Sequence, residues 1–135
     1  MAKARSSTSP TSRTTAVLRK AGATYGIVEK NERFPSPHKV DFLGVIDIIA
    51  MLDIGGYSRI VGIQATGGAS KSNGNARMRK AEAEPRLRAW LASAGVFEVW
   101  SWQHETVGNR KRWRLSKMRA EMTGGEIEWK EVSDG

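Results

Sequence analysis

The chain of 135 residues contains no cysteine, which excludes disulfide bonds, thiolate zinc sites and thiol nucleophiles. Long apolar runs are also missing: the longest, around Val45 to Leu52, is far too short to span a bilayer. The first twenty residues lack the apolar segment of a secretory signal. These absences favour a cytoplasmic protein, and the length is typical of one domain that buries its own core.

Negative charge is scarce, above all near the N-terminus. The chain has 22 lysines and arginines against 14 aspartates and glutamates, a formal net charge of +8. Residues 1–20 hold five of the basic side chains and no acidic one. A basic excess concentrates polyanions near the surface and is typical of nucleic-acid binding, the alternative being charge that only aids solubility. We therefore expect DNA as a partner, and no membrane.

The alternation of apolar segments with turn-forming residues predicts an α/β fold, with a mixed central sheet and flanking helices. Residues 1–12 are small, polar and basic, which predicts a disordered arm before a single domain at 13–135. The expected elements are a helix at 12–21 capped by Ser12, strands at 24–33, 40–52 and 58–66, helices at 75–83 and 85–94, and strands at 96–103, 111–119 and 126–132. Loops are expected at 34–38, 55–56, 67–75 and 104–110. The helices between 66 and 96 predict a crossover and hence one parallel strand pair.

The most informative feature is a carboxylate inside an apolar strand. Asp47 lies between two isoleucines, and burial of an unpaired carboxylate costs several kcal/mol. Gln64 is also flanked by apolar residues on the next strand. A turn at 55–56 makes the two side chains neighbours, since each is about equally far from it. Their oxygens suit Mg²⁺ or Mn²⁺, the alternative being a buried hydrogen-bond network that fixes the strand register.

The stretch DFLGVID at 41–47, the strand GIQAT at 62–66 and the basic helix that follows resemble the PD-(D/E)XK nuclease superfamily, over roughly residues 13–103. This superfamily includes restriction endonucleases and Holliday-junction resolvases, and the chain is most similar to its phage and prophage members. The resemblance implies a restriction-endonuclease-like fold and Mg²⁺- or Mn²⁺-dependent cleavage of DNA, by an endonuclease or a structure-specific resolvase. Because many members are dimers, it also implies a homodimer. In the family an aspartate and a Glu/Gln-x-Lys on adjacent strands hold the metal ion, which assigns Asp47 and Gln64 as ligands.

One position departs from the family pattern, because Thr66 stands where the catalytic lysine is expected. A threonine has no positive charge with which to stabilise a developing phosphorane. Three interpretations remain open. The charge comes from Lys80, Arg77 or Lys71; a divalent ion suffices by itself; or the fold has lost catalysis and kept DNA binding. Thr66 and Lys80 therefore join Asp47 and Gln64 as candidate catalytic residues.

Additional acidic ligands are harder to assign. The family often supplies a glutamate from the first helix, but residues 13–21 contain none. The upstream candidates are Glu29 and Glu32. Asp41 is six residues from Asp47, about 20 Å along one continuous strand, so we expect it to be structural. The expected ion-pair partners of Asp41 are Lys39 and Arg33.

Several basic side chains are candidate DNA contacts because they lie on the first helix, on the loop and helix after the hairpin, or beside an aromatic residue. They are Arg13, Lys71, Arg77, Arg79, Lys80 and Arg112. Trp113 lies among basic residues, so it is either a stacking platform for a base or part of the core. Two further functions stay open: a catalytically inactive DNA-binding protein of the same fold, and an accessory protein that acts through protein partners.

Overall fold

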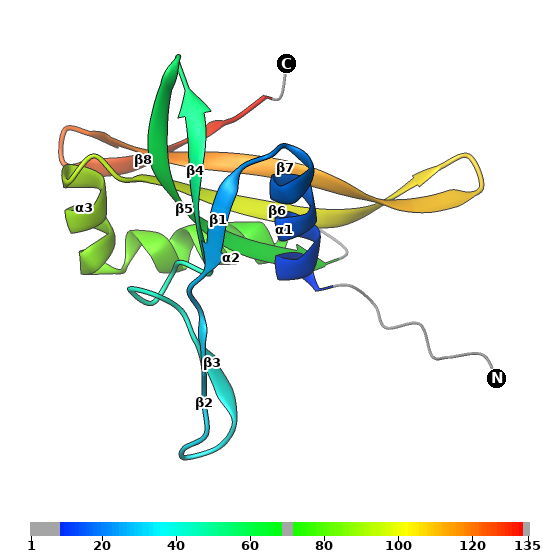
Figure 1. The fold of residues 1–135 in the computed structure, drawn as a ribbon, viewed down its shortest axis with the longest axis horizontal. Helices are drawn as coiled ribbons and strands as arrows, with labels where there is room; N and C mark the ends of the chain where they lie inside the picture. The colour runs from blue at the N-terminus through cyan, green and yellow to red at the C-terminus, as the bar shows by residue number, and fades with distance from the viewer. Residues whose placement is uncertain (1–8, 69–71, 134–135) are drawn as a thin grey trace.

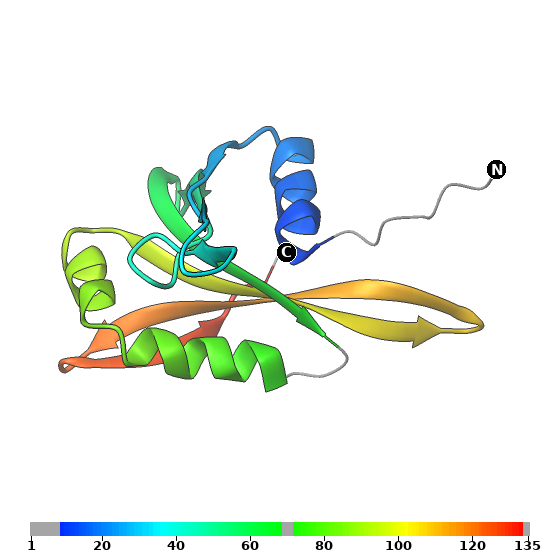
Figure 2. The ribbon, with the colours of Figure 1, turned by 90° about the horizontal axis from the view of Figure 1, so that it is seen from below.

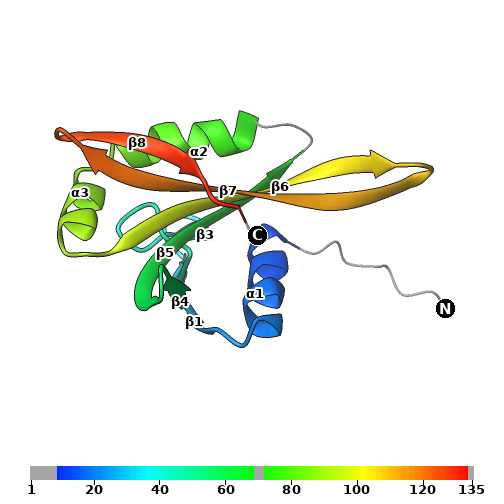
Figure 3. The same ribbon diagram turned by 90° about the horizontal axis from the view of Figure 1, so that it is seen from above.

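The computed structural model describes residues 9–68 and 72–133, which form three layers (Figures 1, 2 and 3). The central layer is a six-stranded sheet with the strand order β1-β4-β5-β6-β7-β8. Helix α1 (Pro10–Lys20) packs on one face, whereas α2 (Ser72–Glu82) and α3 (Pro85–Ala92) pack on the other. No helix in these described ranges is long and apolar enough to cross a membrane.

The six strands of the sheet include one parallel pair, as a single helical crossover requires. They are β1 (Thr24–Ile27), β4 (Ile48–Ile54), β5 (Tyr57–Gly68), β6 (Val96–Val107), β7 (Arg110–Thr123) and β8 (Glu126–Glu131). Strands β5 and β6 are parallel, because α2 and α3 connect them, and the other neighbours are antiparallel. The predicted α/β class and mixed sheet are confirmed. Strands β2 (Lys30–Glu32) and β3 (His38–Val40) form a separate small hairpin beside the sheet (Figure 1).

Two apolar clusters hold the layers together, one on each face of the sheet. Under α1, Leu18 packs with residues of β4, β5 and β6, and under α2 and α3, Met78 and Leu87 pack with Phe97 of β6. Each fully buried side chain of this size contributes about 1.5–3 kcal/mol. The two clusters therefore fix both helical layers against the strands that carry the candidate site.

Some element boundaries differ from the expected ones near the N-terminus. Helix α1 begins at Pro10 because Ser9, not Ser12, is its cap: the Ser9 hydroxyl accepts a hydrogen bond from the Ser12 N–H at 3.0 Å. Residues 1–8 of the expected arm lie outside the described residues. The expected strand at 24–33 is two strands, since the chain leaves the main sheet after Ile27 and pairs again only with β3.

The largest difference concerns residues 104–110, where a loop is expected. Strands β6 and β7 continue through this segment and turn only at Gly108 and Asn109. Gly108 adopts a positive φ of 64°, as a two-residue hairpin turn demands. The paired strands consequently project far beyond the end of β5 (Figures 1 and 2).

Candidate functional site

The β4–β5 hairpin brings Asp47 and Gln64 together, as the turn at 55–56 predicts. Ile63 pairs with the first residue of β4, and its carbonyl accepts the Asp47 N–H at 2.9 Å. Gln64 Nε2 donates to Asp47 Oδ2 at 2.8 Å, and the Ala65 N–H donates to the same oxygen at 2.9 Å. Both side chains are only 3% exposed. The prediction that Asp47 and Gln64 lie next to each other is confirmed.

Asp41 lies at the same site, so the expectation that it is remote from Asp47 was wrong. Residues 41–47 do not extend β4; a single antiparallel bridge closes them into a tight turn. Leu43 and Gly44 there have φ values of 53° and 78°, a left-handed conformation that glycine adopts without strain. The chain reverses, and Gln64 Nε2 also approaches Asp41 Oδ2 at 3.4 Å.

A third carboxylate comes from the segment between β1 and β2. The Val28 N–H donates to the Asp47 carbonyl at 2.8 Å, which holds the next residue, Glu29, beside the hairpin. Glu29, Asp41 and Asp47 each contribute one carboxylate oxygen to a cluster whose atoms lie within 4.8 Å of one another. Of the two upstream glutamates, Glu29 therefore joins the cluster, whereas Glu32 belongs to β2.

Two lysines border this acidic cluster. Lys80 Nζ of α2 lies 3.9 Å from Asp41 Oδ2, and Lys39 Nζ lies 3.3 Å from Glu29 Oε2. The expected pairing of Asp41 with Lys39 or Arg33 is therefore wrong, because the turn at 41–47 aims Asp41 towards α2. Of the two described residues considered as a replacement for the missing lysine, Arg77 and Lys80, the one ion-paired with the cluster is Lys80.

These groups line one open cleft with a volume of about 460 Å³. The first residues of α1, the first turns of α2 and the carboxyl end of β5 form its walls, at one end of the sheet (Figure 2). A Cβ on Gly67 of β5 would lie 3.2 Å from the Pro10 ring of α1, a tight contact, so the absence of a side chain there favours the close approach of the helix start. The lining also includes Thr66, Asn73 and Arg77. Helix N-termini favour anions, which gives the rim of the cleft an attraction for phosphate.

The electrostatics of the cleft centre on Asp47. Burial raises its pKa to about 8, with further contributions from a hydrogen bond shared with Asp41 and repulsion by Asp41 and Glu29. The hydrogen bond from the Ala65 N–H acts in the opposite direction. The pair of Asp47 and Asp41 therefore retains a proton to higher pH than exposed aspartates do.

The residues of the cleft fit a divalent metal ion. Gln64 Oε1 is buried and has no hydrogen-bond partner among the described residues. Buried polar atoms nearly always have a partner, so this oxygen signals a missing one. The three carboxylates make an all-oxygen donor set, which Mg²⁺ and Mn²⁺ prefer. Gln64 faces Asp41 and Asp47 through Nε2, so its oxygen would join this set after a rotation of the side-chain amide.

The other predicted DNA contacts fall into separate places. Arg77 lines the cleft with Lys80. Arg79, one residue before Lys80, is not part of the lining and binds a glutamate of its own helix at 2.8 Å. Arg13 and Arg112 lie at the β6–β7 hairpin, and Lys71 lies outside the described residues. Thus the candidate residues do not form one patch.

The hairpin contacts of Arg13 could not be read from the sequence pattern. Its guanidinium lies 3.7 Å from the ring centre of Trp113. The His104 ring also packs against Trp113, with 3.8 Å between the ring centroids. Trp113 is partly buried by these neighbours, whereas Trp102 beside it is buried. Residues 13 and 113 are far apart in the chain, and only the packing of α1 across the sheet joins them.

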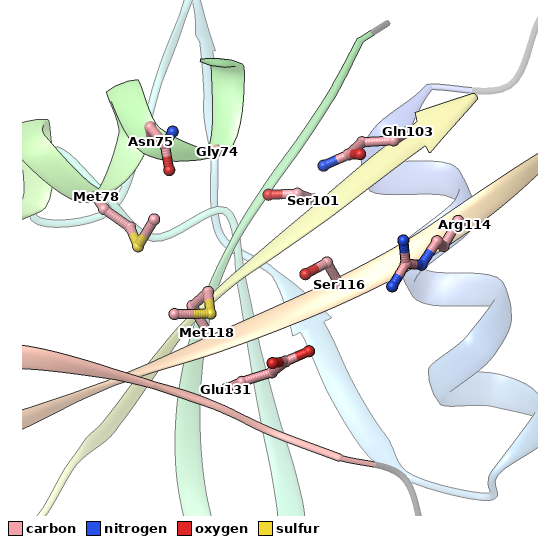
Figure 4. A pocket seen from close by; sticks show the side chains of 9 residues that line it. All are labelled: Gly74, Asn75, Met78, Ser101, Gln103, Arg114, Ser116, Met118 and Glu131. Atoms are coloured by element: carbon pink, nitrogen blue, oxygen red, sulfur yellow. The ribbon is translucent and has the colours of Figure 1, made fainter. Parts of the chain in front are cut away.

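A second cavity, of about 280 Å³, lies between α2 and the strands β6 and β7 (Figure 4). Its lining is mainly serine, amide and methionine side chains, with Arg114 and Glu131 as its charged residues. A single carboxylate in a lining that also carries a guanidinium is not a metal donor set. Of these two cavities, the acidic cleft is therefore the candidate site for metal-dependent chemistry.

The assignment of a function to this chain depends on the cleft geometry itself. Comparisons with protein-family models, with curated proteins and with solved structures found no match.

Proposed function

We propose that this protein is a metal-dependent nuclease of the PD-(D/E)XK type that cleaves DNA with Mg²⁺ or Mn²⁺ in the cleft. The observation that carries the proposal is the buried, unpartnered oxygen of Gln64 beside a cluster of three carboxylates. The restriction-endonuclease-like fold is part of the proposal. The β4–β5 hairpin, the helical crossover and the parallel strand β6 support it, since they place the cluster at the carboxyl end of β5.

The donor atoms have distinct parts in this proposal. Asp47, Asp41 and Glu29 would hold the ion, and Gln64 Oε1 would complete the donor set after a rotation of the amide that now donates to the two aspartates. When bound, a divalent ion supplies Lewis-acid stabilisation of the reacting phosphate and a hydroxide source at neutral pH. The N–H of Ala65 keeps Asp47 Oδ2 in place and Val28 anchors the backbone beside it, so the carboxylate needs little reorganisation to act.

Lys80 is the group that we assign to the role of the missing lysine. Thr66 is neutral, 5% exposed and part of the cleft wall, so it contributes shape but no charge. The Lys80 ammonium reaches the same cleft from α2 and stays half-exposed, available to a substrate phosphate. A cation placed there stabilises negative charge that develops on the phosphate during cleavage.

The charge of the cleft rim supports a polyanionic substrate. Arg77 and Lys39 line it together with Lys80, and the N-terminal turns of α1 and α2 open towards it. Backbone N–H groups at helix N-termini and basic side chains are the usual phosphate contacts of DNA-binding proteins. A phosphodiester drawn to this rim would meet the acidic cluster below it.

The second candidate is a catalytically silent DNA-binding protein of the same fold. Thr66 favours it, because the position of the family lysine carries no charge. The two candidates differ in one property: the nuclease needs a divalent ion for its effect on DNA, whereas the silent protein only binds.

The test is a cleavage assay on supercoiled, linear and branched DNA with Mg²⁺ or Mn²⁺, together with calorimetric titration of Mn²⁺ into the protein. We expect Asp47→Asn to lower cleavage by about 100-fold or more and to abolish Mn²⁺ binding. Asp53→Asn is the matched control, since Asp53 lies exposed on the same strand near the turn, away from the cleft. Cleavage that survives Asp47→Asn contradicts the proposal, and DNA binding without cleavage under any of these conditions favours the silent protein.

A further inference from the structure

The β6–β7 hairpin ends in a two-stranded arm, residues 103–114, that extends beyond the rest of the sheet (Figures 1 and 2). Gly68, the last residue of β5, pairs with Gln103, so beyond this point β6 and β7 pair only with each other. The arm is about 15 Å long at the rise of an antiparallel strand. It starts next to the cleft, because Gly67 lines the cleft and the following residue, Gly68, pairs with Gln103.

The arm is strongly basic for its size. It contains four basic residues against one acidic residue, a net charge of +3. The basic residues, all exposed, are Arg110, Lys111, Arg112 and Arg114. Within the described ranges only Arg112 has an ion pair, with Glu105 across the hairpin at 3.1 Å. An isolated hairpin is marginally stable in water and like charges weaken it further, so the stability of the fold does not explain this composition.

The strand alternation sorts the arm into two faces. Arg110, Arg112 and Arg114 follow one another at every second residue, so their side chains leave the same face. Lys111 and Trp113 belong to the opposite face. At the root of the arm, Arg114 borders the cavity beside α2, where its side chain is seen next to those of Gln103 and Ser116 (Figure 4). The arm therefore presents a row of three guanidinium groups along its length.

Arg13 joins the arm to the cleft. Its guanidinium covers Trp113 at 3.7 Å, on the face opposite the arginine row. The same side chain reaches the cleft wall, because a Cβ on Gly67 would lie 3.4 Å from Arg13 Nη2. One basic side chain thus touches both the cleft wall and the arm.

We propose that the arm lies in the major groove of duplex DNA whose backbone passes through the cleft. This inference rests on the proposed function and adds a form of DNA and a second contact to it. The major groove of B-form DNA admits a two-stranded ribbon, whereas the deep, narrow groove of A-form RNA does not. The arginine row faces phosphates and base edges there, since guanidinium groups bind both.

The test measures binding without cleavage. We would use Asp47→Asn protein in EDTA, a DNA duplex of about three helical turns and fluorescence anisotropy over a range of KCl concentrations. The arm variant is Arg110→Gln with Lys111→Gln, which removes two unpaired charges at the tip. Its matched control is Arg86→Gln with Lys130→Gln, which has the same net charge and changes residues that are neither on the arm nor in the cleft lining.

We expect the arm variant to bind about tenfold more weakly near 0.1 M salt and its log–log salt slope to shrink by about 2, since each lost phosphate contact removes about 0.9. The control should stay within about twofold of the parent. Dimethyl sulfate should methylate guanine N7 in the bound duplex more readily with the arm variant, because N7 lies in the major groove.

Affinity and N7 protection equal to those of the control overturn the inference, and so does an equal loss of affinity for a duplex RNA of the same sequence. The two proposals fail separately. If binding depends on the arm but no DNA is cleaved, only the nuclease proposal is contradicted. If cleavage depends on Asp47 but the arm variant binds normally, only the proposal for the arm is contradicted.

Discussion

The cleft and the arm lie at the same end of the sheet and are built in opposite ways. The cleft gathers three carboxylates within 4.8 Å around Asp47, which is 3% exposed, whereas the arm spreads its guanidinium and ammonium groups over an exposed hairpin. Buried charges interact strongly because the local dielectric constant is low, and exposed charges are screened by salt. We therefore expect pH and divalent ions to govern the cleft, and ionic strength to govern the arm.

The two regions also differ in what holds them in place. Asp47 is fixed by hydrogen bonds from Gln64 and Ala65, and the turn at 41–47 places the neighbouring carboxylate. The arm has strand pairing, one cross-strand ion pair and the stack on Trp113. A preorganised site suits chemistry, and an adaptable charged ribbon suits contact with a long polyanion.

The largest expected effect is the pH dependence of stability that Asp47 causes in the metal-free protein. Its pKa rises from 3.8 to about 8 on folding, so the folded state keeps a proton that the unfolded state releases between these values. This contribution is complete below pH 4 and is lost as the pH rises through 8. Between pH 4 and 8 we expect the unfolding free energy of the parent to fall by an amount on the order of 4 kcal/mol, and that of Asp47→Asn not to show this fall. Urea denaturation over this pH range measures both.

Two further measurements sharpen this expectation. Asp53→Asn should keep the pH dependence of the parent, since Asp53 is exposed on the same strand. Added Mn²⁺ should stabilise the parent at pH 8 and leave Asp47→Asn unchanged, because the ion replaces the proton among the carboxylates. If the stability of Asp47→Asn depended on pH as much as that of the parent, Asp47 would not be the group that causes the pH dependence.

An intermediate effect is expected from two adjacent basic residues of α2. Lys80 faces the acidic cluster at 3.9 Å, whereas Arg79 binds Glu82 and lies outside the cleft lining. We expect Lys80→Gln to lower the cleavage rate about 100-fold at saturating DNA, and Arg79→Gln to change it little. Thr66→Lys should restore part of the rate in the Lys80→Gln protein. Equal rates for the two single variants would remove Lys80 from its assigned role.

The smallest effect concerns the contact that joins the two regions. Arg13→Gln removes the guanidinium from the face of Trp113, which should cost about 1 kcal/mol and lower the melting temperature by a few degrees. Arg19→Gln on the same helix is the control, since Arg19 makes an exposed hydrogen bond to the Tyr25 hydroxyl, away from the arm. Equal melting temperatures for the two variants would show that the stack contributes nothing to the attachment of the arm.

Local sequence patterns sufficed for much of the fold. The glycine pair at 55–56 and the apolar runs on either side predict the β4–β5 hairpin, and the apolar spacing after Pro85 predicts α3. The two strands β6 and β7 were predicted, but their extension through residues 104–110 was missed, because these mostly polar residues have the composition of a loop. Strand pairing there depends on the partner strand, which no local window contains.

The sequence by itself determined that Asp47 and Gln64 are neighbours, because a hairpin turn sets the register of everything that follows it. Only the tertiary structure decided which other groups meet them. Asp41 arrives through a reversal at Leu43 and Gly44, and Lys80 through the packing of α2 beside β5. The turn that brings Asp41 is local, but it interrupts a segment whose apolar composition predicts a continuous strand. The Lys80 contact joins segments far apart in the chain, so it follows from the packing of the layers.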